Sequence, residues 1–201
     1  MLVETQYFPC LEFWAKARKN KEVIIEAHEN YQKRSYRNKC NILSVNKMLT
    51  LSIPLTKGKH ARMPIQEVHI SEDDSWRNQH IQSVKSAYGN APYFEYYWDD
   101  IKELIKNPSN LLYDYNMPIL QYFGKILKVE IKESTAYIKT PTIIDQRQKI
   151  LPKNKHLDWP VYDQVFSDRH DFVSNLSILD LLFCKGPETS LYIREISSLL
   201  P

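Results

Sequence analysis

The sequence predicts an α/β fold, a mixed sheet with helices packed on it, and three patterns of apolar residues support this prediction. A strand, a helix and a second strand follow one another at the start of the chain, which favours a parallel β-α-β unit. Between residues 36 and 70, apolar residues alternate with polar ones, as in antiparallel strands. From residue 71 to 127 they recur at helical spacing instead. An α+β fold is the alternative.

The β-α-β unit is expected within the first 27 residues. Residues 2–7 predict a short strand. Pro9 then stands at the start of a helix that runs to Asn20, and proline is favourable in the first helical turn. Residues 22–27 are rich in Val and Ile, which is typical of a buried strand. A right-handed crossover through the helix makes the two strands parallel.

Three antiparallel strands are expected next, at residues 36–43, 48–55 and 65–70. The polar pair at 46–47 separates the first two strands. A basic, glycine-containing stretch at 57–63 separates the second from the third. Together these strands predict a meander.

Three helical regions follow. Ser71 and Asp74 resemble a helix-start box, which predicts that a helix begins there. One stripe of that helix is expected to face the core: Trp76, His80, Ile81, Val84 and Tyr88. Pro92 opens the second helix. The third spans residues 109–127 and is expected to bend or break at Pro118.

The last third of the chain begins with a segment, about 132–158, that predicts irregular structure. Ser174 is expected to cap a final helix, which ends at Gly186 and the proline after it. No repeat or low-complexity tract divides the sequence. The 201 residues are therefore expected to form one domain.

Composition excludes several common sites. The chain has four glycines, at 58, 89, 124 and 186, and no two are close in sequence. Dinucleotide fingerprints, Walker loops and nucleophile elbows all need closely spaced glycines, so none is present. The three cysteines include no CxxC pair, and we predict no metal site. The cofactor, if there is one, is not indicated.

Charge and cysteine content indicate the cellular compartment and the classes of partner to expect. The net charge of +3 is too small to indicate nucleic acid. An odd number of cysteines, without a signal-like N-terminus, favours reduced thiols in the cytoplasm. No apolar run is long enough to predict a membrane span.

The segment from His28 to Lys39 is the most informative for function. It combines basic, aromatic and amide side chains and contains almost nothing apolar. If it is extended, alternation places Tyr31, Lys33, Ser35, Arg37 and Lys39 on one face. Such a face suits a phosphate or carboxylate beside a base or sugar. A solvated loop is the alternative.

The candidate site follows from this segment. His28 and His80 are the candidate catalytic residues, as general bases, although a histidine on an apolar stripe is more often structural. Lys33 and Arg37 would hold phosphate. The candidate substrate-binding residues are Gln6, Tyr31, Lys33, Arg37, Asn38, Trp76 and Tyr88. We expect the pocket where the Gln6–Pro9 turn, the His28–Lys39 segment and the helix of His80 meet.

Several short motifs, in this order along the chain, resemble the WbqC-like family of bacterial proteins. They are Gln6–Pro9, Asn30–Lys33 with Arg37–Asn38, Leu51–Pro54, Trp76 with His80, Ala87–Tyr88, Ala91–Phe94 and Asn175–Phe183. Compared with longer members, this chain has only residues 130–156 between its third helical region and the last motif. The resemblance identifies no established active site.

What the resemblance implies is a role in bacterial surface-polysaccharide synthesis, because some members occur in O-antigen gene clusters. The first hypothesis is a group-transfer enzyme that moves an aminoacyl, glycyl or acyl group to a sugar or sugar nucleotide. Its partner would be a phosphate-bearing small molecule or a sugar nucleotide. The second is a non-catalytic binding or assembly protein of the same pathway. RNA binding through the aromatic and basic segment is a third hypothesis, which the low net charge disfavours.

Overall fold

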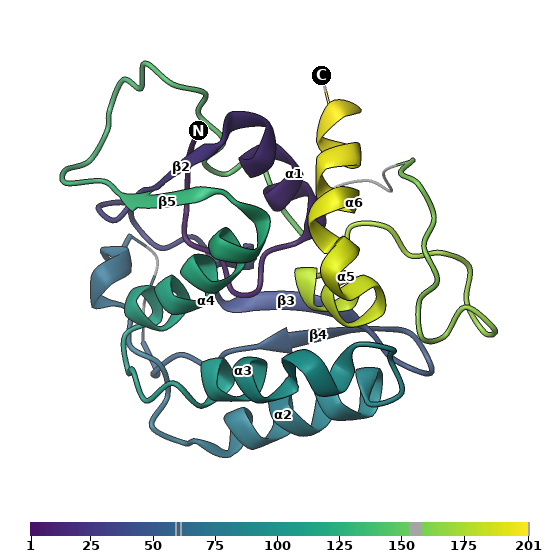
Figure 1. The fold of residues 1–201 in the computed structure, drawn as a ribbon. Coiled ribbons are helices and arrows are strands. Elements are labelled where there is room, and N and C mark those ends of the chain that lie inside the picture. Colours follow the sequence, from purple (N-terminus) through teal and green to yellow (C-terminus); the bar gives the residue numbers. More distant parts are fainter. Residues whose placement is uncertain (59, 61, 153–157, 201) are drawn as a thin grey trace.

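The computed structural model describes residues 1–58, 60, 62–152 and 158–200. Its strands belong to two sheets (Figure 1). One is parallel, with the order β1-β2-β5, formed by β1 (Leu2–Val3), β2 (Glu22–Ile25) and β5 (Glu130–Glu133). The other pairs β3 (Lys39–Leu43) with β4 (Met48–Ser52) antiparallel. Parallel and antiparallel strands combined with helices confirm the predicted α/β fold.

The order in which the chain adds strands to the parallel sheet reverses at β1. Helix α1 (Leu11–Asn20) connects β1 to β2, and β5 then pairs on the far side of β2. After β5 the chain leaves the sheet as a long loop and returns on the other side of β1 (Figure 1). There the amide of Leu2 donates to the carbonyl of Ile144 at 2.9 Å, and the amide of Gln146 donates to the carbonyl of Leu2 at 2.8 Å. In α/β proteins, ligands bind at the carboxyl ends of strands beside such a reversal.

Five further α-helices cover the sheets within the described residues. Helices α2 (Ser75–Tyr88) and α3 (Phe94–Lys106) pack on each other beside the β3-β4 ribbon, and α4 (Leu112–Leu127) leads into β5 (Figure 1). Helix α5 (Ile178–Lys185) precedes α6 (Thr189–Ser198), which packs on α1. Short 3₁₀ turns occupy Tyr36–Asn38, Ile65–Glu67 and Gly186–Glu188.

Aromatic side chains from distant parts of the sequence form the centre of the core. Phe123 of α4 meets Phe8 edge-on, with 6.2 Å between ring centroids, and Trp14 of α1 at 5.9 Å. All three side chains are fully buried. Burying rings of this size supplies much of the apolar area that stabilises a domain. The loop before α1 is thus fixed to α4.

The strands are shorter than predicted, with β3 beginning only after the 3₁₀ turn at Tyr36–Asn38, and two predicted strands differ most. Residues 65–70 form a 3₁₀ turn and isolated bridges instead of a strand, because Pro64 begins the turn and Ile65 and Val68 reach the core from it. The first strand ends at Val3 and not at residue 7. Beyond it the amide of Tyr7 bonds the carbonyl of Tyr36 at 2.9 Å, which takes the chain away from β2.

Of the helices, α6 was not predicted, because the final predicted helix ends at Gly186, and the others differ from the prediction in their boundaries. Pro118 lies within one continuous helix, α4. The carbonyl of Asp114, which loses its helical partner, is on the exposed face, where water can bond it. Ser177, and not Ser174, caps α5, since its hydroxyl accepts from the amide of Leu179 at 3.3 Å. In the segment expected to be irregular, residues 134–152 contain no helix or strand, and residues 153–157 lie outside the described part.

Candidate functional site

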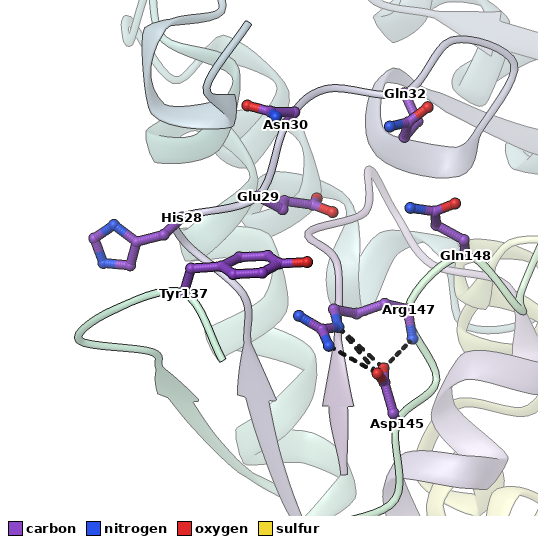
Figure 2. A pocket seen from close by; sticks show the side chains of 8 residues that line it. All are labelled: His28, Glu29, Asn30, Gln32, Tyr137, Asp145, Arg147 and Gln148. Carbon is purple, nitrogen blue, oxygen red and sulfur yellow. Dashed lines mark hydrogen bonds and ion pairs between the residues drawn. The ribbon is translucent and has the colours of Figure 1, made fainter. Parts of the chain in front are cut away.

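A pocket of about 380 Å³ opens at the carboxyl edge of the parallel sheet. It lies where β1 is flanked by β2 on one side and by the returning segment 144–146 on the other. Eight residues line it (Figure 2): His28, Glu29, Asn30, Gln32, Tyr137, Asp145, Arg147 and Gln148. The position agrees with the general rule for α/β sheets.

One wall of the pocket contains a buried ion pair. Arg37 is fully buried, and its guanidinium donates two hydrogen bonds to the carboxylate of Glu29, from Nε to Oε1 at 2.8 Å and from Nη2 to Oε2 at 2.5 Å. Arg37 therefore fixes the orientation of Glu29. Figure 2 shows the Glu29 carboxylate directed toward the space between the pocket walls.

Burial raises the pKa of the Glu29 carboxyl above its ordinary value, and the guanidinium of Arg37 opposes this rise. The negative charges of Glu4 and Glu26, which follow β1 and β2, raise it further. A buried carboxylate with a raised pKa in a pocket wall is typical of a general acid or base. Glu29 is the strongest candidate of this kind among the lining residues.

The opposite wall is built around Arg147. Its guanidinium bonds Asp145, with Nη2 at 2.8 Å from Oδ2, and also reaches Glu26, with Nη1 at 3.1 Å from Oε2. The ring of Tyr137 lies 5.2 Å from the guanidinium carbon, a cation–π contact. The ion pairs hold Arg147, and Arg147 supports an exposed aromatic ring at the rim of the pocket.

The remaining lining residues are polar and accessible. His28 is exposed at the rim, as are the amide side chains of Asn30, Gln32 and Gln148. Figure 2 shows the amides of Gln32 and Gln148 across the space from Glu29. The pocket thus combines two carboxylates, an arginine, a histidine, three amides and an aromatic ring.

The structure does not bring all the sequence-predicted residues to this pocket. His28 lines it. Arg37 stands behind it, through Glu29. Gln6 is also behind it, because its amide donates to Glu4 Oε1 at 3.2 Å and Glu4 Oε2 accepts from the amide of Gln148 at 2.9 Å.

The predicted alternation in the His28–Lys39 segment is wrong, because the segment is not an extended strand. It contains a turn with Arg34 at φ 59° and a 3₁₀ turn at Tyr36–Asn38. Lys33 is exposed and outside the pocket lining. Tyr31 is buried and donates to Asn38 Oδ1 at 3.1 Å, and the amide of Asn38 donates to the carbonyl of Ile53 at 2.9 Å. Both side chains anchor the segment to the core.

The Gln6–Pro9 turn and the helix of His80 do meet, but in a packed aromatic cluster. The hydroxyl of Tyr7 lies 2.9 Å from Nδ1 of His80, and the Trp76 ring is edge-on to the imidazole at 5.0 Å. Burial lowers the pKa of His80 to about 4, opposed by a hydrogen bond to the backbone of Ser52. The imidazole is therefore neutral near pH 7. These residues do not line the pocket.

Tyr88 belongs to a separate network. Its hydroxyl donates to Asp180 Oδ1 at 3.0 Å and accepts from the amide of Leu43 at 3.3 Å. Asp180 also accepts from the hydroxyl of Tyr162 and from the amide of Gln164, at 2.5 and 2.8 Å. The network ties α2 and α5 to the loop after residue 158.

His28 is the only lining residue that was predicted as a site residue, so seven were not predicted: Glu29, Asn30, Gln32, Tyr137, Asp145, Arg147 and Gln148. A signal was available for the carboxylates around them, because Glu4 and Glu26 come directly after two strands that are parallel neighbours. No comparable signal marks Tyr137 or Arg147, which lie in a segment without secondary structure.

Within the described residues, no group of three or more His, Cys, Asp or Glu side chains is arranged to hold a metal ion. A search of the same residues finds no helix that is both long and apolar enough to span a membrane. All three cysteines are free and buried.

The WbqC-like protein family matches residues 5–157, which is most of the chain, so the protein belongs to this family. The matched range includes every residue that lines the pocket. Helices α5 and α6 lie beyond it, together with the Asn175–Phe183 motif that had contributed to the resemblance. No curated protein and no solved structure is significantly similar to the chain.

Proposed function

We propose that the protein is a group-transfer enzyme of bacterial surface-polysaccharide synthesis and that it holds a sugar in the pocket beside Glu29. The observation that carries this proposal is the lining of that pocket at the carboxyl edge of the sheet. Sugar hydroxyls both donate and accept hydrogen bonds. Carboxylates accept from these hydroxyls, guanidinium groups donate to them, and side-chain amides can do both. An aromatic ring packs on the apolar face of a sugar. The occurrence of other family members in O-antigen gene clusters supports the pathway.

The proposed reaction transfers an acyl or aminoacyl group from an activated donor. An oxygen or nitrogen of the sugar forms a bond to the acyl carbon, its proton passes to the Glu29 carboxylate, and the bond between the acyl carbon and the leaving group breaks. Glu29 suits this role because it is buried, has a raised pKa and is held by Arg37. His28, at the rim, is the second candidate base.

The pocket lining offers few groups that could hold a phosphate on the donor or on the sugar. Arg37 already gives two hydrogen bonds to Glu29, and Lys33 is outside the lining. Arg147 and His28 are the groups of the lining that can carry positive charge. We therefore expect neutral sugars to bind without a nucleotide.

The test is a thermal-shift and titration series with neutral sugars, sugar phosphates and sugar nucleotides, since a ligand of the native state raises its melting temperature. Tyr137→Ala removes the aromatic ring at the rim and is expected to weaken sugar binding. Tyr96→Ala is the matched control, because Tyr96 is 81% exposed and lies on α3, outside the pocket.

Equal loss of binding in both tyrosine variants, or no binding of any sugar by the wild type, contradicts the proposal. Binding of a sugar without turnover of any activated acyl donor favours the non-catalytic alternative, a binding or assembly protein of the same pathway.

A further inference from the structure

Glu26 follows β2 directly, is fully buried and accepts four hydrogen bonds. Its Oε1 accepts from the amide of His28 at 3.1 Å and from the hydroxyl of Ser134 at 2.7 Å. Its Oε2 accepts from the amide of Ile138 at 3.0 Å and from Nη1 of Arg147 at 3.1 Å. An ionised carboxylate offers about four lone-pair sites, so all of them are used.

The four donors come from separate parts of the pocket. His28 begins the wall that contains Glu29, Ile138 follows the rim residue Tyr137, and Arg147 forms the opposite wall. Ser134 directly follows β5, and its hydroxyl also accepts from the amide of Ala27 at 3.0 Å. Segments separated by more than a hundred residues therefore meet at one carboxylate.

Glu26 does not line the pocket itself. Its charge is matched by Arg147, whose side chain is 11% exposed, and Arg147 in turn supports the Tyr137 ring. Partners behind the residues that touch a ligand fix their orientation and strongly affect binding.

We infer that Glu26 is the positioning residue of this pocket: through four hydrogen bonds, its buried carboxylate sets the relative placement of the two walls and the aromatic rim. The inference rests on the proposed function insofar as a sugar is the ligand. The placement itself can be measured without any ligand.

Glu26→Gln tests the inference because glutamine has the same shape but only one acceptor oxygen. Whichever way the amide is turned, its NH₂ group faces two donors, either His28 and Ser134 or Ile138 and Arg147. One of the two backbone amides, His28 or Ile138, then loses its acceptor. Glu22→Gln is the matched control, since Glu22 lies on the same strand and pairs with Lys132 at the surface.

The first measurement is hydrogen exchange of single amides by NMR, which reports local opening. In Glu26→Gln we expect faster exchange at His28 or Ile138, while the amide of Ile24, bonded to the carbonyl of Met1 at 2.8 Å, stays protected. The second measurement is the dissociation constant of the sugar found for the wild type. We expect it to rise about 10- to 100-fold in Glu26→Gln and to be unchanged in Glu22→Gln.

Two results overturn the inference: both amides remain as protected as in the wild type, or the sugar binds Glu26→Gln as tightly as the wild type. If Glu26→Gln does not fold, Arg147→Met replaces it, and unchanged sugar affinity in that variant also overturns the inference. Failure of the wild type to bind any sugar contradicts the proposed function instead, and the exchange data alone then decide whether Glu26 organises this edge.

Discussion

At the level of single residues, the buried ionisable side chains follow three different arrangements. Glu29 and Arg37 neutralise each other inside the fold, whereas His80 avoids charge by remaining neutral. Asp180 is held by three neutral donors, and burial raises its pKa. Each arrangement reduces the free-energy cost of burying a polar group. A mutation or a change of pH therefore affects the stability of the fold differently at each of these sites.

Arg37→Ala is expected to destabilise the fold by about 3–5 kcal/mol, because it leaves the buried Glu29 carboxylate without its partner. Chemical denaturation measures the change. Lys33→Ala is the control and should change stability by less than about 0.5 kcal/mol, because Lys33 is exposed. Similar stability of the two variants would contradict the structural role of Arg37.

Because the pKa of His80 is lowered, we expect the folded state to lose stability in acid. Its pKa in the folded state is about 4, below the ordinary value of 6.5, so its contribution is complete above pH 6.5 and is lost as the pH falls toward 4. At about 1.4 kcal/mol per unit, the loss approaches ~3 kcal/mol. Urea denaturation between pH 4 and 7.5 measures the free energy of unfolding. It should fall toward pH 4 in the wild type and depend much less on pH in His80→Gln.

The carboxyls provide an internal check on that experiment. Burial raises the pKa of Glu29 and Asp180, so their contributions have the opposite sign and diminish as the pH rises through the folded-state pKa. Both remain in His80→Gln. The difference between the two stability curves therefore isolates the imidazole, and parallel curves would show that His80 does not titrate in this range.

At the level of elements, α4 and β5 approach closely because a glycine lies between them. A Cβ atom on Gly124 would lie 2.8 Å from Cγ1 of Ile131 and 2.9 Å from the carbonyl oxygen of Val129. The left-handed Lys128, at φ 54°, ends the helix and turns the chain directly back onto it. β5 can therefore pair with β2 while α4 packs on its face.

Gly124→Ala tests this packing. In an open helix the change would stabilise by up to about 1 kcal/mol, since alanine has the higher helix propensity. Here we expect a net loss of about 1–3 kcal/mol, because both contacts are shorter than van der Waals separation. Gln121→Ala, at an exposed position of the same helix, is the control. Thermal denaturation of the pair distinguishes crowding from propensity, and an increase in melting temperature for Gly124→Ala would contradict the close approach.

For the whole molecule, the sequence predicted most of the elements, but it predicted a strand at residues 65–70 that does not form, and it predicted neither α6 nor the pocket. Pro9 and the Val- and Ile-rich residues 22–27 predicted the β-α-β unit because those signals are local. Glu26 and Arg147, in contrast, are 121 residues apart and meet only when the loop after β5 returns beside β1. Spacing along the chain carries no information about such contacts. The basic segment contributes His28, Glu29, Asn30 and Gln32 to the pocket lining, whereas Arg37 bonds Glu29 behind it.

The C-terminal helices contribute to the same core although the family match ends at residue 157. Leu181, Phe183 and Ile193 are fully buried. The amide of Ile178 donates to the carbonyl of Pro9 at 3.0 Å, which fixes the start of α5 beside the loop that leads into α1. Removing α5 and α6 would expose this apolar surface and leave backbone groups near α1 without partners.

A chain ending at residue 157 is therefore expected not to fold cooperatively, even though it retains every residue that lines the pocket. Circular dichroism during thermal denaturation, together with limited proteolysis, measures this. The full chain should give one sigmoidal transition and resist proteolysis, whereas the shortened chain should give no sharp transition and be cut throughout. A cooperative transition in the shortened chain would show that the matched region has a core of its own, and residues 158–200 would then be an addition to it. We expect the first result, because α6 packs on both α1 and α4, the helices that lead into β2 and β5 of the parallel sheet.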